Sequence, residues 1–190
     1  SSAALSLPAA LLLSIASAML IAAAGNTIND YADVEIDKIN RRDRPIPSGR
    51  AKKNFALYIA IALFLAGVST SFLVNSNAAA IAMLNAALLI TYSFYFKHVL
   101  LVGNVIISFV VGSTFLFGGA AMNNLQAPFF LAVISMFANL GRELVKKIED
   151  EVGDRWYVIK KLLSSFTSPI RFGEREMRFS AAVCMAITIV

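Results

Sequence analysis

Five long apolar runs, each near the length that crosses a lipid bilayer, dominate this chain of 190 residues. A membrane-spanning α-helix needs about 20 consecutive, mostly apolar residues. Because the runs are continuous rather than alternating, and backbone groups in lipid must be satisfied within their own segment, the sequence predicts helices and excludes barrel strands. The predicted spans are 5–28, 55–74, 78–96, 101–122 and 127 to about 142, and a further apolar segment covers 179–190.

The composition supports a membrane protein and excludes a soluble domain. Hydrophobic residues make up 58% of the chain and charged residues 15%, with a mean hydropathy of +0.70. A net charge of +5 could suit a nucleic-acid-binding protein, but that class needs a basic face on a solvated fold. The single cysteine, Cys184, lies in an apolar run and provides neither a disulfide nor a thiolate metal site. We therefore expect an all-α polytopic transmembrane helical bundle with no nucleic-acid partner.

Charge is segregated between alternate connections of the predicted bundle. Every Lys, Arg, Asp and Glu lies within 29–53, at Lys97 or within 142–178, whereas the turns at 75–77 and 123–126 have no charge. If the chain crosses the membrane at each run, the charged connections share one side, which the positive-inside rule assigns to the cytoplasm. We predict a multi-pass cell-membrane protein, a single domain over 1–190 with cytoplasmic loops at about 29–54 and 142–178.

The first charged loop directly continues the first apolar run. If the helix also continues, Asn29, Asp33 and Asp37 are four residues apart and share one face. Like charges at this spacing repel each other unless a cation neutralises them. Ligands that are all oxygen atoms suit a hard ion such as Mg²⁺. The spacing therefore predicts a metal site at this end of the span.

The second charged loop repeats the four-residue spacing. If this loop is helical, the spacing places four charged residues on one stripe. The cations Arg142 and Lys146 would lie nearer the membrane, and the carboxylates Asp150 and Asp154 nearer water. Such a stripe can bind a diphosphate through its cations and the associated magnesium through its carboxylates. Mixed charges are also normal on a solvated loop, but two DxxxD spacings at the ends of two separate spans favour a shared site.

A basic loop, 40–50, separates the two clusters in the sequence. Two prolines and a glycine punctuate it, so an ordered turn is expected rather than a helix. Its arginines could bind a second anionic substrate or the anionic headgroups of membrane lipids. The prolines that follow Arg44 fix the direction of this residue, which makes it the substrate-binding candidate of the loop.

These motifs resemble the signature loops of the UbiA superfamily of intramembrane prenyltransferases. The resemblance rests on 29–37, on the Arg44-Pro45-Ile46-Pro47-Ser48-Gly49 stretch and on 150–154. Within the superfamily, 141–144 and 117–120 are most similar to the archaeal digeranylgeranylglyceryl phosphate synthases. The resemblance implies nine membrane helices, so this chain would be incomplete at both ends, without the first helix and most of the last three.

The resemblance also implies roles for individual residues. It assigns a catalytic role to four aspartates: Asp33, Asp37, Asp150 and Asp154. It assigns the binding of magnesium and diphosphate to the same four residues together with Asn29. Lys97 matches the family's basic residue at the next cytoplasmic helix end and would contact the diphosphate. Two departures from the family pattern are His98, where a second basic residue is usual, and Lys147, where related sequences commonly have Asp. The stretch 156–166 is longer and more apolar than the corresponding family loop.

The implied chemistry is electrophilic alkylation, in which Mg²⁺ and basic residues stabilise the departing diphosphate and an acceptor captures the allylic cation. The archaeal lipid branch would transfer a geranylgeranyl (polyprenyl) group to geranylgeranylglyceryl phosphate, a lipid-like acceptor, in ether-lipid synthesis. A UbiA-type aromatic prenyltransferase for quinones or chlorophylls is the alternative enzyme. A divalent-cation transporter is the alternative from another class, but it would place ionisable residues at the span centres, which have none here.

Overall fold

The computed structural model describes the backbone of residues 6–97 and 99–161, and their side chains except those of 100 and 147–161. Every regular secondary-structure element in this part of the chain is a helix, which confirms the predicted all-α class. The segment 179–190, His98, Cys184 and residues 162–166 lie outside the described residues. The helices are α1 (Leu7–Ala32), α2 (Val34–Asn40), α3 (Lys53–Val74), α4 (Ser76–Thr91), the π-helix η1 (Tyr92–Phe96), α5 (Leu100–Ala121) and α6 (Gln126–Lys161).

Five helices are long and apolar enough to cross a membrane, in agreement with the predicted spans. They cover Leu7–Ala32, Lys53–Val74, Ser76–Phe96, Leu101–Ala121 and Gln126–Lys146. The chain is therefore a multi-pass membrane protein. The predicted loops are more helical than expected, because α1 and α2 occupy most of 29–40 and α6 continues to Lys161. Residues 41–52 form an irregular connection between α2 and α3 at this end of the bundle.

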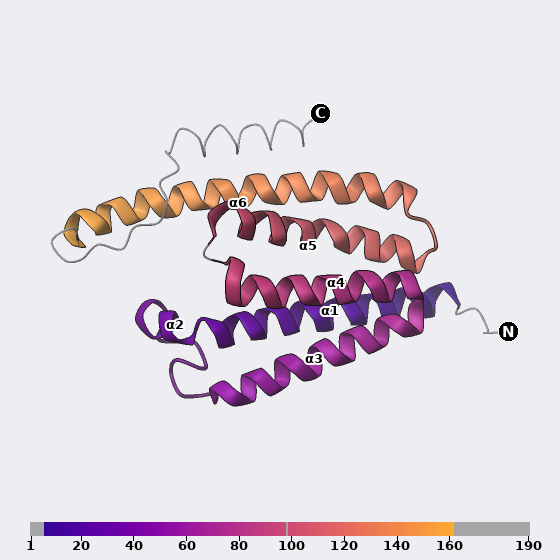
Figure 1. Ribbon diagram of the computed structural model, residues 1–190, viewed down its shortest axis with the longest axis horizontal. Coiled ribbons are helices and arrows are strands. Elements are labelled where there is room, and N and C mark those ends of the chain that lie inside the picture. The colour runs from indigo at the N-terminus through magenta and orange to yellow at the C-terminus, as the bar shows by residue number, and fades with distance from the viewer. Residues whose placement is uncertain (1–5, 98, 162–190) are drawn as a thin grey trace.

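Across the bundle the helices lie in the order α3, α1, α4, α5 and α6 (Figure 1). Successive spans along the chain run antiparallel, so the neighbours α1 and α4 run in the same direction. Helix α1 packs on α3, α4 and α5, whereas α6 packs on α5. Figure 1 places α2, the C-terminal end of α4 and the C-terminal half of α6 at one end, and the α3–α4 and α5–α6 connections at the other. The charged connections therefore lie together, as the sequence predicts for the described residues.

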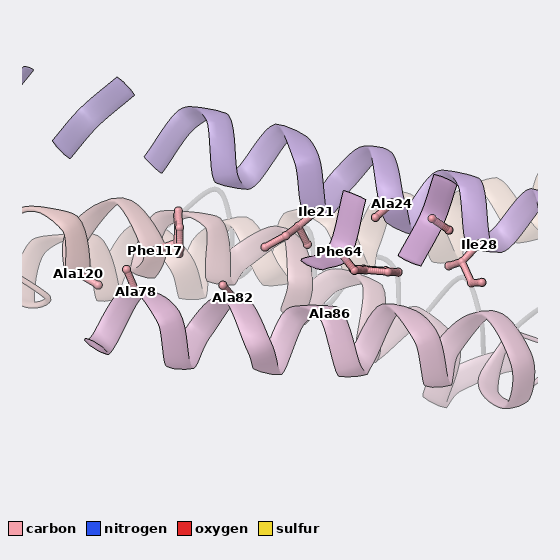
Figure 2. Packing of buried hydrophobic residues seen from close by; sticks show 10 residues of the cluster. Ile21, Ala24, Ile28, Phe64, Ala78, Ala82, Ala86, Phe117 and Ala120 are labelled. Carbon is pink, nitrogen blue, oxygen red and sulfur yellow. The ribbon is translucent and has the colours of Figure 1, made fainter. Parts of the chain in front are cut away.

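Small residues let the central helices approach closely. Helix α4 presents Ala78, Ala82 and Ala86, spaced by four, toward α1 (Figure 2). At the contact between α1 and α3, a Cβ added to Gly67 would lie 2.7 Å from Cγ1 of Ile21, and Ser17 Oγ donates a 2.7 Å hydrogen bond to the Gly67 carbonyl. Such contacts suit a membrane bundle, because helix association in lipid depends on close packing and interhelical hydrogen bonds.

The arrangement predicts opposite labelling of its two ends in sealed, right-side-out vesicles. In a Cys184→Ala background, a cysteine at Lys53 should be protected from an impermeant thiol reagent, and a cysteine at Asn123 should react. The reason is that the positive-inside rule predicts a cytoplasmic position for the charged end. A cysteine at Lys97 should behave like one at Lys53, and cysteines at Asn75 and Asn77 like one at Asn123. For Arg171, which lies outside the described residues, the charge pattern of the sequence predicts the same protection as for Lys53. Labelling of Asn123 and Lys97 from the same side would contradict this topology.

Candidate functional site

The candidate site begins where α1 bends into α2. Asp33 is the bend residue, but two backbone hydrogen bonds of helical spacing continue through it, from Asp33 N to Asn29 O at 3.0 Å and from Asp37 N to Asp33 O at 2.8 Å. Nδ2 of Asn29 donates to Oδ2 of Asp33 at 3.1 Å. The four-residue spacing therefore brings the first two predicted ligands together, while the bend directs Asp37 to a different partner.

Lys97 reaches this cluster from the end of the third span. The π-helix η1 closes with a 2.9 Å hydrogen bond from Lys97 N to Tyr92 O. The Lys97 ammonium donates to Asn29 Oδ1 at 3.0 Å and forms an ion pair with the Asp33 carboxylate. The rings of Tyr31 and Phe94 pack edge to face, 6.3 Å apart, and further join α1 to η1. The structure thus brings Lys97 to Asn29 and Asp33, which precede it by 68 and 64 positions in the sequence.

A glycine allows η1 to lie against α5. A Cβ added to Gly103 would lie 2.6 Å from the Phe96 carbonyl oxygen and 3.3 Å from the Tyr92 ring. Such a contact is too short to be tolerated without movement of backbone. Gly103 therefore supports the position from which Lys97 reaches α1.

Arg44 binds the other carboxylate of the first motif. Its NH1 donates to Asp37 Oδ2 at 2.8 Å and to Asp30 Oδ1 at 2.7 Å. The irregular loop is ordered by its own hydrogen bonds, including Ser48 N to Arg44 O at 3.0 Å, and Gly49 has a φ of 78°. The loop is therefore an ordered turn, as expected, and it anchors its arginine on the helix pair.

Both central carboxylates are buried. Asp33 and Asp37 are each 6% exposed. A buried carboxylate without a partner is costly, so each depends on the cation beside it, Lys97 or Arg44. By contrast, Glu35 and Lys38 form an exposed ion pair on α2 at 2.9 Å, in which the hydrogen bond and charge of Lys38 lower the pKa of the Glu35 carboxyl. That pair is solvated surface and adds little to stability.

The donor set of the first motif fits a hard divalent cation. Asp33, Asp37 and Asn29 offer only oxygen ligands, the type that Mg²⁺ prefers. Among the described contacts, Oδ2 of each aspartate is engaged and Oδ1 receives no hydrogen bond. No three His, Cys, Asp or Glu side chains form a metal-binding group within the described residues. A complete site here needs ligands from elsewhere, such as the second motif or a substrate.

A family model described as the UbiA prenyltransferase family matches residues 1–190. The chain belongs to the UbiA prenyltransferase family. Curated relatives include the digeranylgeranylglyceryl phosphate synthase of Methanothrix thermoacetophila, 41% identical over 172 residues that cover 90% of this chain and 62% of the relative. That of Methanoregula boonei is 42% identical over 180 residues, covering 94% and 62%. The sequence-based resemblance is thereby confirmed.

A solved structure from work on digeranylgeranylglyceryl phosphate synthase in membranes shares the fold of this UbiA-family chain. The two superpose with a TM-score of 0.77 at 35% sequence identity, over 94% of this chain and 61% of that one. The chain thus spans about three fifths of the length of these relatives. The transmembrane helical fold expected of the UbiA family is confirmed, while the roles of individual residues stay predictions.

The second UbiA motif lies on α6. Asp150 and Asp154 fall within this helix, in the part whose side chains, like that of Lys147, are not described. The side chain of Arg142 is 72% exposed, with its NH1 3.7 Å from Glu143 Oε1. Lys146 is exposed as well. No hydrogen bond or ion pair among the described residues joins either cation to the Asn29 cluster, so their role as a diphosphate clamp stays a prediction.

The structure adds four residues that the sequence interpretation did not select. Asp30 shares Arg44 with Asp37, and the seven-residue spacing of the two aspartates on one helical face is a signal that could have identified it. The ring of Tyr92 lies beside Gly103 of α5, and the side chain of Glu143 on α6 is 21% exposed. Asn104 is buried on α5. These last contacts depend on which helices are neighbours, which the sequence motifs do not indicate.

Proposed function

We propose that the full-length protein is a magnesium-dependent intramembrane prenyltransferase of archaeal ether-lipid synthesis. It would transfer a geranylgeranyl group from its diphosphate to geranylgeranylglyceryl phosphate. The observation that carries this proposal is the pair of buried carboxylates, Asp33 and Asp37, each held by a cation at the charged end of an apolar bundle. Membership in the UbiA family and similarity to curated synthases support the reaction class.

The proposed diphosphate site combines both motifs. Asn29, Asp33 and Asp37, with Asp150 and Asp154 from α6, would hold Mg²⁺, which would neutralise the charge that develops on the departing diphosphate. Lys97 would exchange its contact with Asp33 for the diphosphate oxygens, because an ammonium group and phosphate form strong charge-assisted hydrogen bonds. Arg142 and Lys146 would bind further phosphate oxygens from α6. The site would face the cytoplasm under the positive-inside rule.

The apolar spans would accommodate the isoprenoid chain. A dry environment strengthens electrostatic interactions at the reacting carbon and limits capture of the allylic cation by water. The acceptor, an amphiphile with a phosphate group, would reach the same end of the bundle from the membrane. Anionic headgroups of the surrounding membrane lipids would compete with the acceptor phosphate for the basic loop.

Arg44 is the candidate contact for the acceptor phosphate. In the structure it binds Asp30 and Asp37, and its side chain remains 30% exposed, so an anionic group can approach it from solvent. Arg44→Ala should raise the KM for geranylgeranylglyceryl phosphate roughly tenfold or more, the equivalent of one lost charge-assisted hydrogen bond. The KM for the prenyl diphosphate should change much less, whereas Lys146→Ala should impair mainly the diphosphate step.

Steady-state kinetics with each substrate varied in turn provide the measurement. Arg50→Ala is the matched control, because Arg50 is exposed and bonds only within the loop, to Ser48 Oγ at 3.0 Å and to the Asp43 carbonyl. It should leave both KM values near those of the wild type. An Arg44→Ala variant that weakens only diphosphate binding would contradict the acceptor assignment.

Competition between acceptors tests the proposed function itself. Purified full-length protein should be given geranylgeranyl diphosphate, Mg²⁺ and equal amounts of geranylgeranylglyceryl phosphate and an aromatic acid, and the products identified by mass spectrometry. The proposal expects the ether lipid as the dominant product. Prenylation of the aromatic acid alone would favour the other UbiA-type reaction. Release of no diphosphate, together with Mn²⁺ uptake in sealed vesicles, would favour a transporter.

A further inference from the structure

One carboxylate at the charged end of the bundle is turned inward and has no role in the metal site. The side chain of Glu143 is 21% exposed, whereas that of the preceding Arg142 is 72% exposed. The following residue, Leu144, is 2% exposed. Helix α6 therefore directs Glu143 toward the protein and Arg142 away from it.

The packing of α5 on α6 shows what Glu143 faces. Ser108 Oγ accepts a 3.2 Å hydrogen bond from Asn139 Nδ2, and a Cβ added to Gly119 would lie 2.7 Å from Cγ of Pro128. The two helices are antiparallel, and both contacts define the same register. One helical turn beyond the Ser108 and Asn139 pair, toward the charged end, this register sets Asn104 level with Glu143.

Asn104 has an unused donor at this level. It is 5% exposed, and its Nδ2 has no hydrogen-bond partner among the described residues. Buried polar groups are usually hydrogen-bonded, and an unpaired donor in a native structure commonly indicates a functional role or a missing partner molecule. Here the donor belongs to a helix that packs directly on the one with the inward carboxylate.

Asn104 and Glu143 lie near the proposed diphosphate site. The Tyr92 carbonyl accepts the 2.9 Å hydrogen bond from Lys97 N that closes η1, and Lys97 pairs with Asp33 of the α1 cluster. The Tyr92 ring also lies beside Gly103, the residue before Asn104. Positions seven and eleven residues apart share a helical face, which places 143 on the same side of α6 as 150 and 154.

We propose that Glu143 receives the proton of the acceptor hydroxyl during ether formation, and that Asn104 Nδ2 positions the oxygen of that hydroxyl. The inference rests on the proposed function and extends it to the second half of the reaction. The hydroxyl oxygen bonds to C1 of the prenyl group while the bond from C1 to the diphosphate oxygen breaks. The diphosphate leaves with the bonding pair, and the hydroxyl proton passes to the Glu143 carboxylate, which later returns it to water.

A thiol analogue of the acceptor separates this role from a structural one. General-base groups typically contribute a factor of about 10² to 10⁴ in rate, so Glu143→Gln should slow ether formation by about a hundredfold or more. The KM for the prenyl diphosphate should stay within about twofold. An acceptor with a thiol in place of the free hydroxyl is far more acidic than an alcohol and is a strong nucleophile that depends much less on a base. With this acceptor, Glu143→Gln should react within about tenfold of the wild type.

Three variants make the experiment decisive. Glu35→Gln removes an exposed carboxylate at the same end of the bundle and should leave both reactions unchanged. Asn104→Ala should raise the KM for the hydroxyl acceptor more than it lowers kcat. Glu143→Asp keeps a carboxylate in the same place and should retain more activity than Glu143→Gln; it also serves if Glu143→Gln unfolds.

The results separate this inference from the proposed function. An undiminished rate of Glu143→Gln with the hydroxyl acceptor, or equal losses with the hydroxyl and thiol acceptors, would overturn the role of Glu143. A wild-type protein that forms no ether from any glycerophosphate acceptor would instead overturn the proposed function.

Discussion

Asp33→Asn in the full-length protein is expected to lower turnover by more than about a hundredfold while the protein stays folded. The substitution removes a ligand charge from the proposed magnesium site, and leaving-group stabilisation by the ion is worth several kcal/mol. The amide can still accept a hydrogen bond from Lys97, whose side chain is 26% exposed and can turn to water. Product formation at saturating Mg²⁺, together with the unfolding midpoint in detergent, provides the measurement.

Two further variants locate the effect. Asp154→Asn should produce a comparable loss, because the proposal assigns both aspartates to one site. Asp43→Asn is the control, since Asp43 is an exposed residue of the loop, and it should be nearly as active as the wild type. Near-normal activity of both Asp33→Asn and Asp154→Asn at saturating Mg²⁺ would reject a shared metal site.

Lys97→Met has the second largest expected effect, and it acts on both stability and activity. Without the ammonium group, the buried Asp33 carboxylate loses its cation, which should lower the free energy of unfolding by roughly 1–3 kcal/mol. Loss of charge-assisted hydrogen bonds to the diphosphate should also weaken prenyl diphosphate binding roughly tenfold or more. Chemical denaturation and substrate kinetics measure the two effects separately.

A double variant tests whether the stability cost comes from the unpaired carboxylate. Combining Lys97→Met with Asp33→Asn removes both charges, so the free energy of unfolding of the double variant should be higher than that of Lys97→Met alone. Lys53→Met is the matched control, because Lys53 lies 4.9 Å over the Tyr31 ring and pairs with no carboxylate among the described residues. Additive effects of Lys97→Met and Asp33→Asn would contradict an energetic coupling between the two side chains.

The spans could be predicted from the sequence because every backbone group in lipid must form a hydrogen bond within its own segment. Continuous apolar runs of sufficient length must be helices, and the charges at 29–53 and 142–178 indicate where they end. The helical content of the connections was less predictable. Residues 34–40 and 143–155 are rich in charged side chains, but they continue helices that begin in the apolar runs, so composition alone does not mark where α2 and α6 end.

The candidate site could be predicted only in part. Spacing alone brings Asn29 and Asp33 together, because the helical hydrogen bonds of α1 continue to Asp33. The ion pair between Asp37 and Arg44 depends on the bend at Asp33 and on the path of the loop back to the helix. Neither feature can be deduced from the residue spacing. Likewise, the inward direction of Glu143 depends on the register of α6 against α5. A stripe drawn at four-residue intervals instead selected its exposed neighbour, Arg142.

The most direct test of the account follows the oxygen atom of the acceptor. Full-length protein should be incubated with geranylgeranyl diphosphate, Mg²⁺ and geranylgeranylglyceryl phosphate that has ¹⁸O in its free hydroxyl, and both products analysed by mass spectrometry. We predict an ether that retains ¹⁸O and a released diphosphate without the label, because the acceptor oxygen attacks the allylic carbon. Formation of no ether, or appearance of the label in the diphosphate, would contradict the account.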